Sequence, residues 1–137
     1  MVTNVELTRR VYEALNRWDL DAVREAFDPA IEWREAEGNP AQPDGSPWFG
    51  PDAVRERLFD RIAAGWDEFR ASPVAFHDAG DSVVVEGRYR GVIRTSARRV
   101  DAQFCHIWRV RDGRFACFQQ YVDTAQLQTA IFGSRGT

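Results

Sequence analysis

This 137-residue chain is poor in the histidine, cysteine and lysine side chains that carry much acid–base and covalent chemistry. The chain contains two histidines, His77 and His106, two cysteines, Cys105 and Cys117, and no lysine. The lack of lysine excludes Schiff-base catalysis and a P-loop phosphate site, since both need a lysine amine. Two histidines and two cysteines without a Cys-x-x-Cys spacing argue against a structural zinc site. Histidine and carboxylate side chains remain as candidates for proton transfer.

His106 lies in a segment whose side chains alternate between two faces. Segments 99–110 and 114–122 both read as strands, and the Asp112-Gly113 dipeptide between them is typical of a tight hairpin. Successive residues of a strand point to opposite faces, so His106 and Gln120 are expected to face the same cavity. The residues that share this face are Phe104, His106 and Trp108 on one strand and Phe118, Gln120 and Val122 on the next.

The elements that position these residues follow from the spacing of apolar side chains. Apolar residues recur with helical spacing in segments 3–17 and 51–64, whereas residues 36–50 contain three Pro and three Gly and are expected to form a loop. The full predicted order is helix 3–17, a short helix from Asp19 that ends at Asp28-Pro29, strand 30–35, helix 51–64, strands 70–78, 82–93, 99–110 and 114–122, and a short C-terminal helix from Asp123.

Helices followed by a run of strands predict a single α+β domain spanning residues 1–137, with helices on one face of a curved sheet. Such a sheet encloses a cone-shaped cavity, which is a common ligand site. With 44% hydrophobic residues, the chain can form a core without disulfides or metals. A net charge of −3 gives no general attraction to nucleic acid or to anionic membranes. No apolar stretch is long enough to span a membrane, and we expect a cytoplasmic protein.

Four motifs in order resemble those of SnoaL-like proteins. They are RVYEALNRWDLDA at 10–22, WFGPDAV at 48–54, FCHIWRVRDGR at 104–114 and YVDTA at 121–125. The resemblance implies the cone-shaped α+β barrel of the nuclear transport factor 2-like superfamily, with three N-terminal helices in a curved mixed or antiparallel sheet. That superfamily includes ketosteroid isomerases, polyketide cyclases, limonene epoxide hydrolases, scytalone dehydratases and non-enzymatic binding domains, so the fold alone does not define the function.

Comparison with the ketosteroid isomerases implies a base at Glu35. Glutamate can move a proton beside a carbonyl, and an apolar pocket can raise its pKa towards neutrality. In the same register, the tyrosine that binds the oxyanion is replaced by Val11, and Tyr12 is one residue away. The aspartic acid of that oxyanion hole is replaced by His106, which can donate a hydrogen bond or act as an acid or base.

The catalytic residues of two other enzyme groups in the superfamily are replaced in this chain. The Arg and Asp that limonene epoxide hydrolases carry on the middle strand correspond to Gly87 and Tyr89, and their remaining Asp corresponds to Gln120. The acid–base Asp of SnoaL-type polyketide cyclases also corresponds to Gln120. An amide cannot exchange a proton usefully at neutral pH, so Gln120 is expected to orient a carbonyl or a water.

These residues together predict a pocket protein for a small hydrophobic metabolite that carries a carbonyl. If the protein is an enzyme, the expected chemistry is cofactor-free isomerisation, cyclisation or dehydration, with Glu35 as base and His106 as acid or carbonyl-polarising group. The residues expected to bind the substrate are Gln120, Tyr89, Tyr12, Trp33, Trp48, Trp66, Phe104, Trp108 and Phe118.

Structural roles are the alternative explanation for the same residues. Glu35 could be a solvated carboxylate or a partner of Arg34, His106 could bond a backbone carbonyl, and Asp123 fits a helix N-cap. A non-catalytic ligand-binding or dimerisation domain would then keep the fold without turnover. The two hypotheses predict different cavities. An enzyme would have an open cavity lined by polar groups, whereas in a binding or structural domain the cavity would be filled by Trp33, Trp48 and Trp66.

The face of the sheet opposite the pocket predicts a partner. Strand alternation places Cys105, Ile107, Cys117 and Tyr121 on this outer face, which makes the cysteines unsuitable as nucleophiles in the pocket. An apolar patch on a sheet needs cover, and the family resemblance favours dimers joined through this face. We therefore expect a homodimer.

Overall fold

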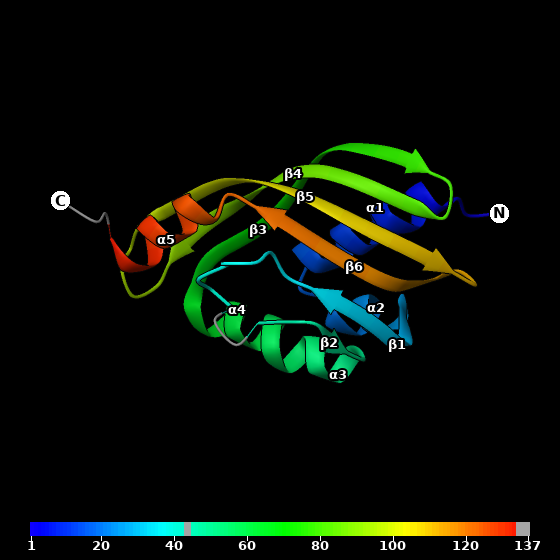
Figure 1. Ribbon diagram of the computed structural model, residues 1–137, viewed down its shortest axis with the longest axis horizontal. Helices are drawn as coiled ribbons and strands as arrows, with labels where there is room; N and C mark the ends of the chain where they lie inside the picture. The colour runs from blue at the N-terminus through cyan, green and yellow to red at the C-terminus, as the bar shows by residue number, and fades with distance from the viewer. Residues whose placement is uncertain (43–44, 134–137) are drawn as a thin grey trace.

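The computed structural model describes residues 1–42 and 45–133. Its helices are α1 (Asn4–Asn16), α2 (Leu20–Glu25), α3 (Pro51–Val54), α4 (Asp60–Gly65) and α5 (Thr124–Phe132), with a π-helical segment (Arg55–Phe59) joining α3 to α4. Its strands are β1 (Phe27–Arg34), β2 (Trp48–Phe49), β3 (Trp66–Ala79), β4 (Ser82–Ile93), β5 (Arg99–Arg111) and β6 (Arg114–Val122). Figure 1 shows their arrangement.

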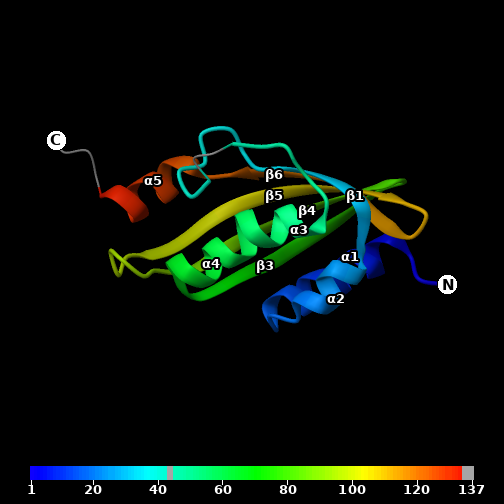
Figure 2. The same ribbon diagram turned by 90° about the horizontal axis from the view of Figure 1, so that it is seen from below.

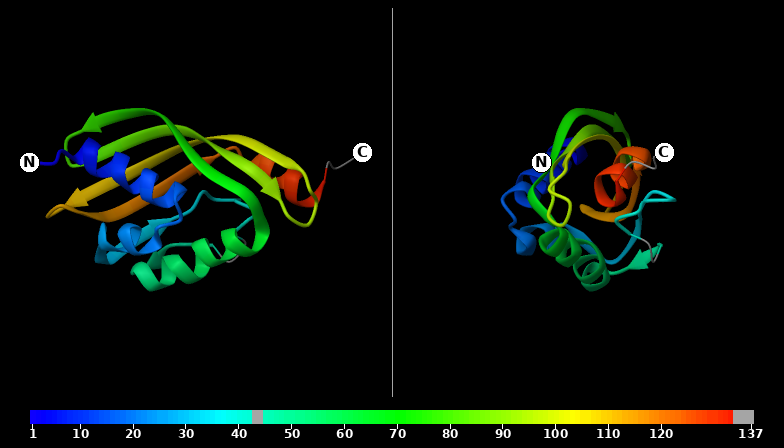
Figure 3. Two further views of the ribbon diagram at one scale, coloured as in Figure 1. Left: turned by 180° about the vertical axis from the view of Figure 1, so that it is seen from behind. Right: turned by 90° about the vertical axis from the view of Figure 1, so that its left-hand side faces the viewer.

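The strands form a single curved sheet in the order β2-β1-β6-β5-β4-β3. Strand β1 runs parallel to β6, and the other neighbours are antiparallel, so the sheet is mixed. Helices α1 to α4 lie on the concave side (Figure 2), and the end view shows the sheet curving around the space that they close (Figure 3, right). The predicted α+β cone is confirmed.

The observed elements differ from the predicted ones mainly around β1. The sequence predicted that Asp28-Pro29 ends the second helix, but α2 ends at Glu25 and β1 begins at Phe27. Phe27 is buried and pairs with Phe115 of β6, and the register then shifts before Glu32. Proline is tolerated at such an irregularity because it has no N–H to donate to the ladder.

Side-chain caps fix the starts of two helices. Thr3 caps α1: its hydroxyl accepts a hydrogen bond from the Glu6 N–H at 3.1 Å, and the Glu6 carboxylate accepts one from the Thr3 N–H. Asp123 caps α5 by accepting from the Gln126 N–H at 3.1 Å, as predicted. The α5 helix then places Leu127 against the sheet, where it closes one end of the cone.

Asn16, at the end of α1, fastens this helix to β3. Its amide donates to the Ala71 carbonyl at 2.8 Å and accepts from the Ala71 N–H at 3.0 Å. Ala71 is completely buried, so no solvent can replace these bonds. The pair of bonds holds the inner face of α1 against the sheet, and this face carries Tyr12.

We predict that Asn16→Ala lowers the free energy of unfolding by about 1–3 kcal/mol, because it leaves a buried backbone N–H and carbonyl without partners. Urea unfolding measures the change. Glu13→Ala, an exposed position on the same helix, is the control and should change stability by less than about 0.5 kcal/mol. Equal losses in the two variants would contradict the role given to Asn16.

Candidate functional site

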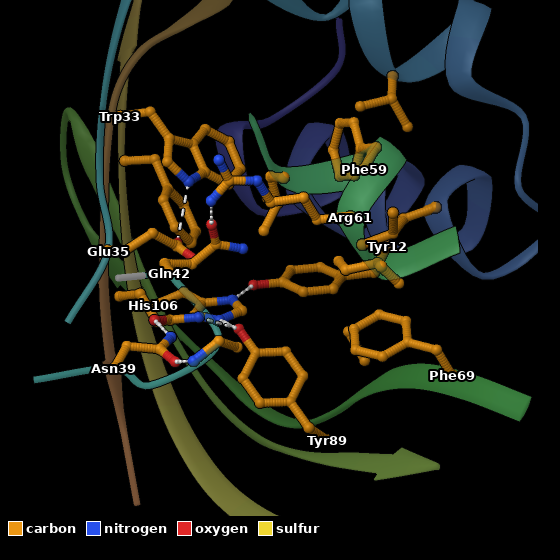
Figure 4. A pocket seen from close by; sticks show the side chains of 18 of the residues that line it. Tyr12, Trp33, Glu35, Asn39, Gln42, Phe59, Arg61, Phe69, Tyr89 and His106 are labelled. Carbon is orange, nitrogen blue, oxygen red and sulfur yellow. Dashed lines mark hydrogen bonds between the residues drawn. The ribbon is translucent and has the colours of Figure 1, made fainter. Parts of the chain in front are cut away.

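The cone encloses a cavity of about 80 Å³ lined by α1, the helices after β2, and the inner face of the sheet. The predicted site residues that line it are Tyr12, Trp33, Glu35, Trp66, Tyr89, His106, Trp108, Phe118 and Gln120. Figure 4 shows the side chains of Glu35, His106, Tyr12 and Tyr89 converging from different elements. His106 and Gln120 thus lie on the face of the sheet that strand alternation predicted.

Two of the predicted substrate-binding residues do not line the cavity. Trp48 is buried on the short edge strand β2, and its indole donates to the Gly45 carbonyl at 2.7 Å. Phe104 lies beneath the His106 ring, with 3.9 Å between the ring centroids. The Phe104 ring occupies the space above Gly87, where a Cβ would come within 2.4 Å of it. Both aromatic residues support the wall rather than form its surface.

Glu35 follows β1, and its side chain continues the inward alternation of Ile31 and Trp33. One carboxyl oxygen, Oε2, accepts a hydrogen bond from the Trp33 indole at 3.0 Å, while Oε1 is buried without a partner among the described residues. Arg34 pairs instead with Glu32, with 3.1 Å between Nε and Oε2. Glu35 is therefore neither a solvated carboxylate nor the partner of Arg34.

Burial raises the pKa of the Glu35 carboxyl from its ordinary 4.5 to about 7, and the hydrogen bond from Trp33 offsets part of that rise. The cause is desolvation, because an ionised carboxylate loses its water in an apolar cavity. A carboxyl with this pKa exchanges its proton readily near neutral pH, which is the property required of a general acid or base.

His106 is held between two tyrosine hydroxyls rather than by a backbone carbonyl. Its Nδ1 lies 2.5 Å from the Tyr12 hydroxyl oxygen, and its Nε2 is hydrogen-bonded to the Tyr89 hydroxyl. Burial lowers the pKa of the imidazole well below its usual 6.5, so the ring is neutral. Both ring nitrogens are thus occupied by tyrosine hydroxyls.

Tyr12 supplies the hydroxyl that sequence comparison placed at Val11. Its side chain is buried, and its oxygen also accepts a hydrogen bond from the Trp108 indole at 2.9 Å. The sequence pattern already placed Tyr12 on the inner face of the helix, because Thr8, Val11, Tyr12 and Leu15 share one helical stripe. Burial raises the pKa values of Tyr12 and Tyr89 well above 10, so both hydroxyls keep their protons.

Gln120 connects the site to the loop after β1. Its Oε1 accepts hydrogen bonds from the Ala36 N–H at 3.1 Å and the Asn39 amide at 3.0 Å, and its Nε2 donates to the Tyr89 hydroxyl at 2.8 Å. In this structure Gln120 orients Tyr89 and the loop.

The loop after β1 and helix α4 add polar residues that the sequence did not single out. Asn39, Gln42 and Arg61 line the cavity, and Arg61 donates to the Gln42 amide oxygen at 3.4 Å. Loop 36–50 has no apolar periodicity, so its contribution could not be assigned from sequence. The part of this loop at residues 43–44 lies outside the described residues.

The described residues show neither a metal site nor a membrane-spanning helix. Within residues 1–42 and 45–133, no group of three His, Cys, Asp or Glu side chains is placed to hold a metal ion. Over the same ranges, no helix has the length and apolar character needed to cross a bilayer. Cys105 and Cys117 are free thiols that do not line the cavity, as strand alternation predicted.

Comparison with known proteins places this cone in a family. The family model for the SnoaL-like domain matches residues 8–118. The chain belongs to the SnoaL-like family. A search of curated proteins gave no match.

Solved structures show the same fold over nearly the whole chain. A nuclear transport factor 2-like protein from Burkholderia thailandensis is 32% identical, with 96% of this chain and 98% of that chain covered and a TM-score of 0.88. One of unknown function from Burkholderia pseudomallei is 30% identical, with 96% and 99% covered and a TM-score of 0.87. TerC, co-crystallised with polyporic acid, is 24% identical, with 93% and 97% covered and a TM-score of 0.83.

The raised pKa of Glu35 predicts how stability depends on pH. Because the folded protein binds this proton more tightly than the unfolded chain, the stabilising contribution is present below pH 4.5 and is lost as pH rises through about 7. Relative to Glu35→Gln, the wild type should therefore lose about 3 kcal/mol of unfolding free energy between pH 4 and pH 8. Urea unfolding of both proteins across this range measures it, and a constant difference would disprove the assigned pKa.

Proposed function

We propose that this protein is a cofactor-free enzyme that moves a proton on a small hydrophobic compound carrying a carbonyl group. The buried Glu35 carboxyl carries this proposal, because Glu35 lines the cavity, its Oε1 has no hydrogen-bond partner among the described residues, and its pKa is raised to about 7. A buried ionisable group with a perturbed pKa is typical of a catalytic position. Isomerisation, cyclisation and dehydration all use such a group.

The proposed roles follow from the contacts of each residue. Glu35 removes a proton from carbon beside the carbonyl and returns it to another atom of the substrate. Tyr12 and Tyr89 both line the cavity, and the hydroxyl that is not donating to His106 can donate to the carbonyl oxygen as negative charge develops on it. His106 positions both hydroxyls and remains neutral. The apolar walls exclude water, which strengthens these interactions.

The size and lining of the cavity support a small, mostly apolar substrate. Trp33, Trp66 and Phe118 form apolar walls, and Trp33 stacks on Phe118 with 3.8 Å between the ring centroids. About 80 Å³ is less than the roughly 150 Å³ that holds benzene in an engineered cavity. One ring is therefore the upper limit of size for a first substrate, and such a compound fits only when the lining side chains move apart.

The alternative is a ligand-binding domain without turnover. The small volume and the aromatic walls favour it, as does Gln120 in place of the acid–base residue of the polyketide cyclases. The two functions differ in turnover. An enzyme would convert a bound ketone, whereas a binding domain would bind it unchanged, and Glu35 would then contribute only to affinity.

Turnover of cyclohex-3-enone tests the proposal directly. Removal of a proton from C2 and its return at C4 gives the conjugated enone, which is followed by its ultraviolet absorbance. We expect Glu35→Gln to reduce the rate roughly 10²–10⁴-fold, since general-base catalysis is lost. The wild-type rate should rise with pH through about 7 as Glu35 ionises.

Glu32→Gln is the matched control, because Glu32 lies on the same strand and pairs with Arg34. This variant should keep the wild-type rate. A Glu35→Gln protein that is as active as the Glu32→Gln protein would reject Glu35 as the base.

We also propose that two copies of the chain associate through the outer face of β4, β5 and β6. Cys105 pairs in register with Tyr121, and Ile107 pairs with Val84, so these side chains adjoin one another on the face opposite the cavity. Tyr121 is 54% exposed although it is a large aromatic residue. An apolar cluster of this kind is suited to burial against a second copy.

Sedimentation at micromolar concentration should give twice the mass of one chain for the wild type. Ile107→Asp should shift the mass to that of one chain, because a charge would be buried in the interface. Val74→Asp, at an exposed apolar position on β3, is the control and should remain dimeric. A wild-type mass of one chain would contradict the dimer.

A further inference from the structure

Two neighbours of the tyrosines have fixed hydrogen-bonding directions. The Trp108 indole N–H can only donate, so the Tyr12 oxygen accepts its bond at 2.9 Å. The Gln120 amide is oriented by the Ala36 backbone N–H, which must face Oε1. Its Nε2 therefore donates to the Tyr89 oxygen at 2.8 Å. Each tyrosine oxygen thus accepts one hydrogen bond from outside the Tyr12–His106–Tyr89 chain.

The hydrogens within this three-residue chain can then be counted. A neutral imidazole carries one N–H, and each tyrosine carries one O–H, which makes three hydrogens in all. The two links from His106 to the tyrosines each use one hydrogen. If Nδ1 is protonated, His106 donates to Tyr12, Tyr89 donates to Nε2, and the Tyr12 hydrogen is left over. If Nε2 is protonated, the Tyr89 hydrogen is left over.

We propose that the chain Tyr12–His106–Tyr89 offers one hydrogen-bond donor to the ligand, and that the tautomer of His106 determines which tyrosine provides it. Tyr12 and Tyr89 both line the cavity, where a buried donor needs an acceptor. The ligand group at this position is therefore an acceptor, such as a ketone or enolate oxygen. This inference extends the proposed function and rests on it only for the location of the ligand.

The arrangement lets one site accept two placements of the carbonyl. A ligand oxygen near Tyr12 selects the Nδ1–H form, and an oxygen near Tyr89 selects the Nε2–H form. The exchange costs little, because each form makes the same number of hydrogen bonds within the chain. His106 is a positioning residue in this scheme, since it touches the ligand through neither ring nitrogen.

Nitrogen-15 NMR of the histidine side chains tests the tautomer in the ligand-free protein at neutral pH. The chain has only two histidines, and the exposed His77, bonded to Glu86, provides an internal reference. In the wild type, His106 should show a neutral ring with a single proton shared between the two tautomers. A doubly protonated ring would leave both hydroxyl hydrogens free and would overturn the proposal.

Removing one hydroxyl at a time should fix opposite tautomers. In Tyr12→Phe, the proton should lie on Nε2, where Tyr89 accepts it, because a proton on Nδ1 would face the hydrocarbon edge of the new ring. In Tyr89→Phe, the proton should lie on Nδ1, facing Tyr12. The same tautomer in both variants would overturn the proposal, and unchanged His77 signals verify that each variant is folded.

Ligand preference provides a second readout that needs no turnover. Cyclohexanone and methylidenecyclohexane have nearly the same shape, but only the ketone accepts a hydrogen bond. The fluorescence of Trp33, Trp66 and Trp108, which line the cavity, reports binding of either compound. The wild type should prefer the ketone by about threefold to tenfold, which corresponds to one hydrogen bond.

Each single variant should keep this preference, because one donor remains, and Tyr12→Phe/Tyr89→Phe should lose it. Loss of the preference in only one single variant would identify a dedicated donor and overturn the tautomer mechanism. If neither single variant folds, the wild type still decides, because absence of the ketone preference would overturn the proposal. These results do not depend on Glu35, so they are separate from the turnover test.

Discussion

The hydrogen bonds of His106 connect the parts of the molecule that must stay in register for a cavity to exist. Through Tyr12 they reach α1, through Tyr89 they reach β4, and the histidine itself lies on β5. Gln120 extends the network to β6 and the loop after β1. Polar groups buried among aromatic rings are costly unless they are partnered, so the network specifies one relative placement of these elements.

Glu35 is the exception to this rule. Every other buried side-chain nitrogen and oxygen in the described part of the chain has a hydrogen-bond partner, whereas Oε1 of Glu35 has none. The protein thus carries a desolvated carboxyl at the cost of stability at neutral pH and above, where the group ionises. Such local cost is typical of functional positions, where the rest of the fold must compensate.

The sequence predicted the sheet and its inner face better than it predicted the site. Alternation with a period of two placed His106, Trp108 and Gln120 correctly, because a strand leaves its side chains only two directions. The bounds of β4 and β6 agree with the predicted strands for the same reason.

The positions of the site residues depend on contacts between segments that are distant in the sequence, and local sequence patterns do not encode such contacts. Counting residues from a resemblance selected Val11 as the oxyanion-binding position, although the helical stripe already placed Tyr12 on the inner face. Trp48 was expected in the pocket because it is aromatic, yet its position on the edge strand β2 turns it into the core. Asn39 and Gln42 lie in an aperiodic loop, and only the bonds that this loop makes with Gln120 and Arg61 bring them to the cavity.

Gly87 determines the depth of the cavity through the side chain that it lacks. The Phe104 ring rests directly on its backbone, and His106 stacks on that ring. Any larger residue would lift this pair of rings towards the opposing helix and reduce the space above them. A Cβ here would come within 2.4 Å of the Phe104 ring and 2.5 Å of the Ser72 carbonyl oxygen, so the floor of the cone lies lower over glycine than it could over alanine.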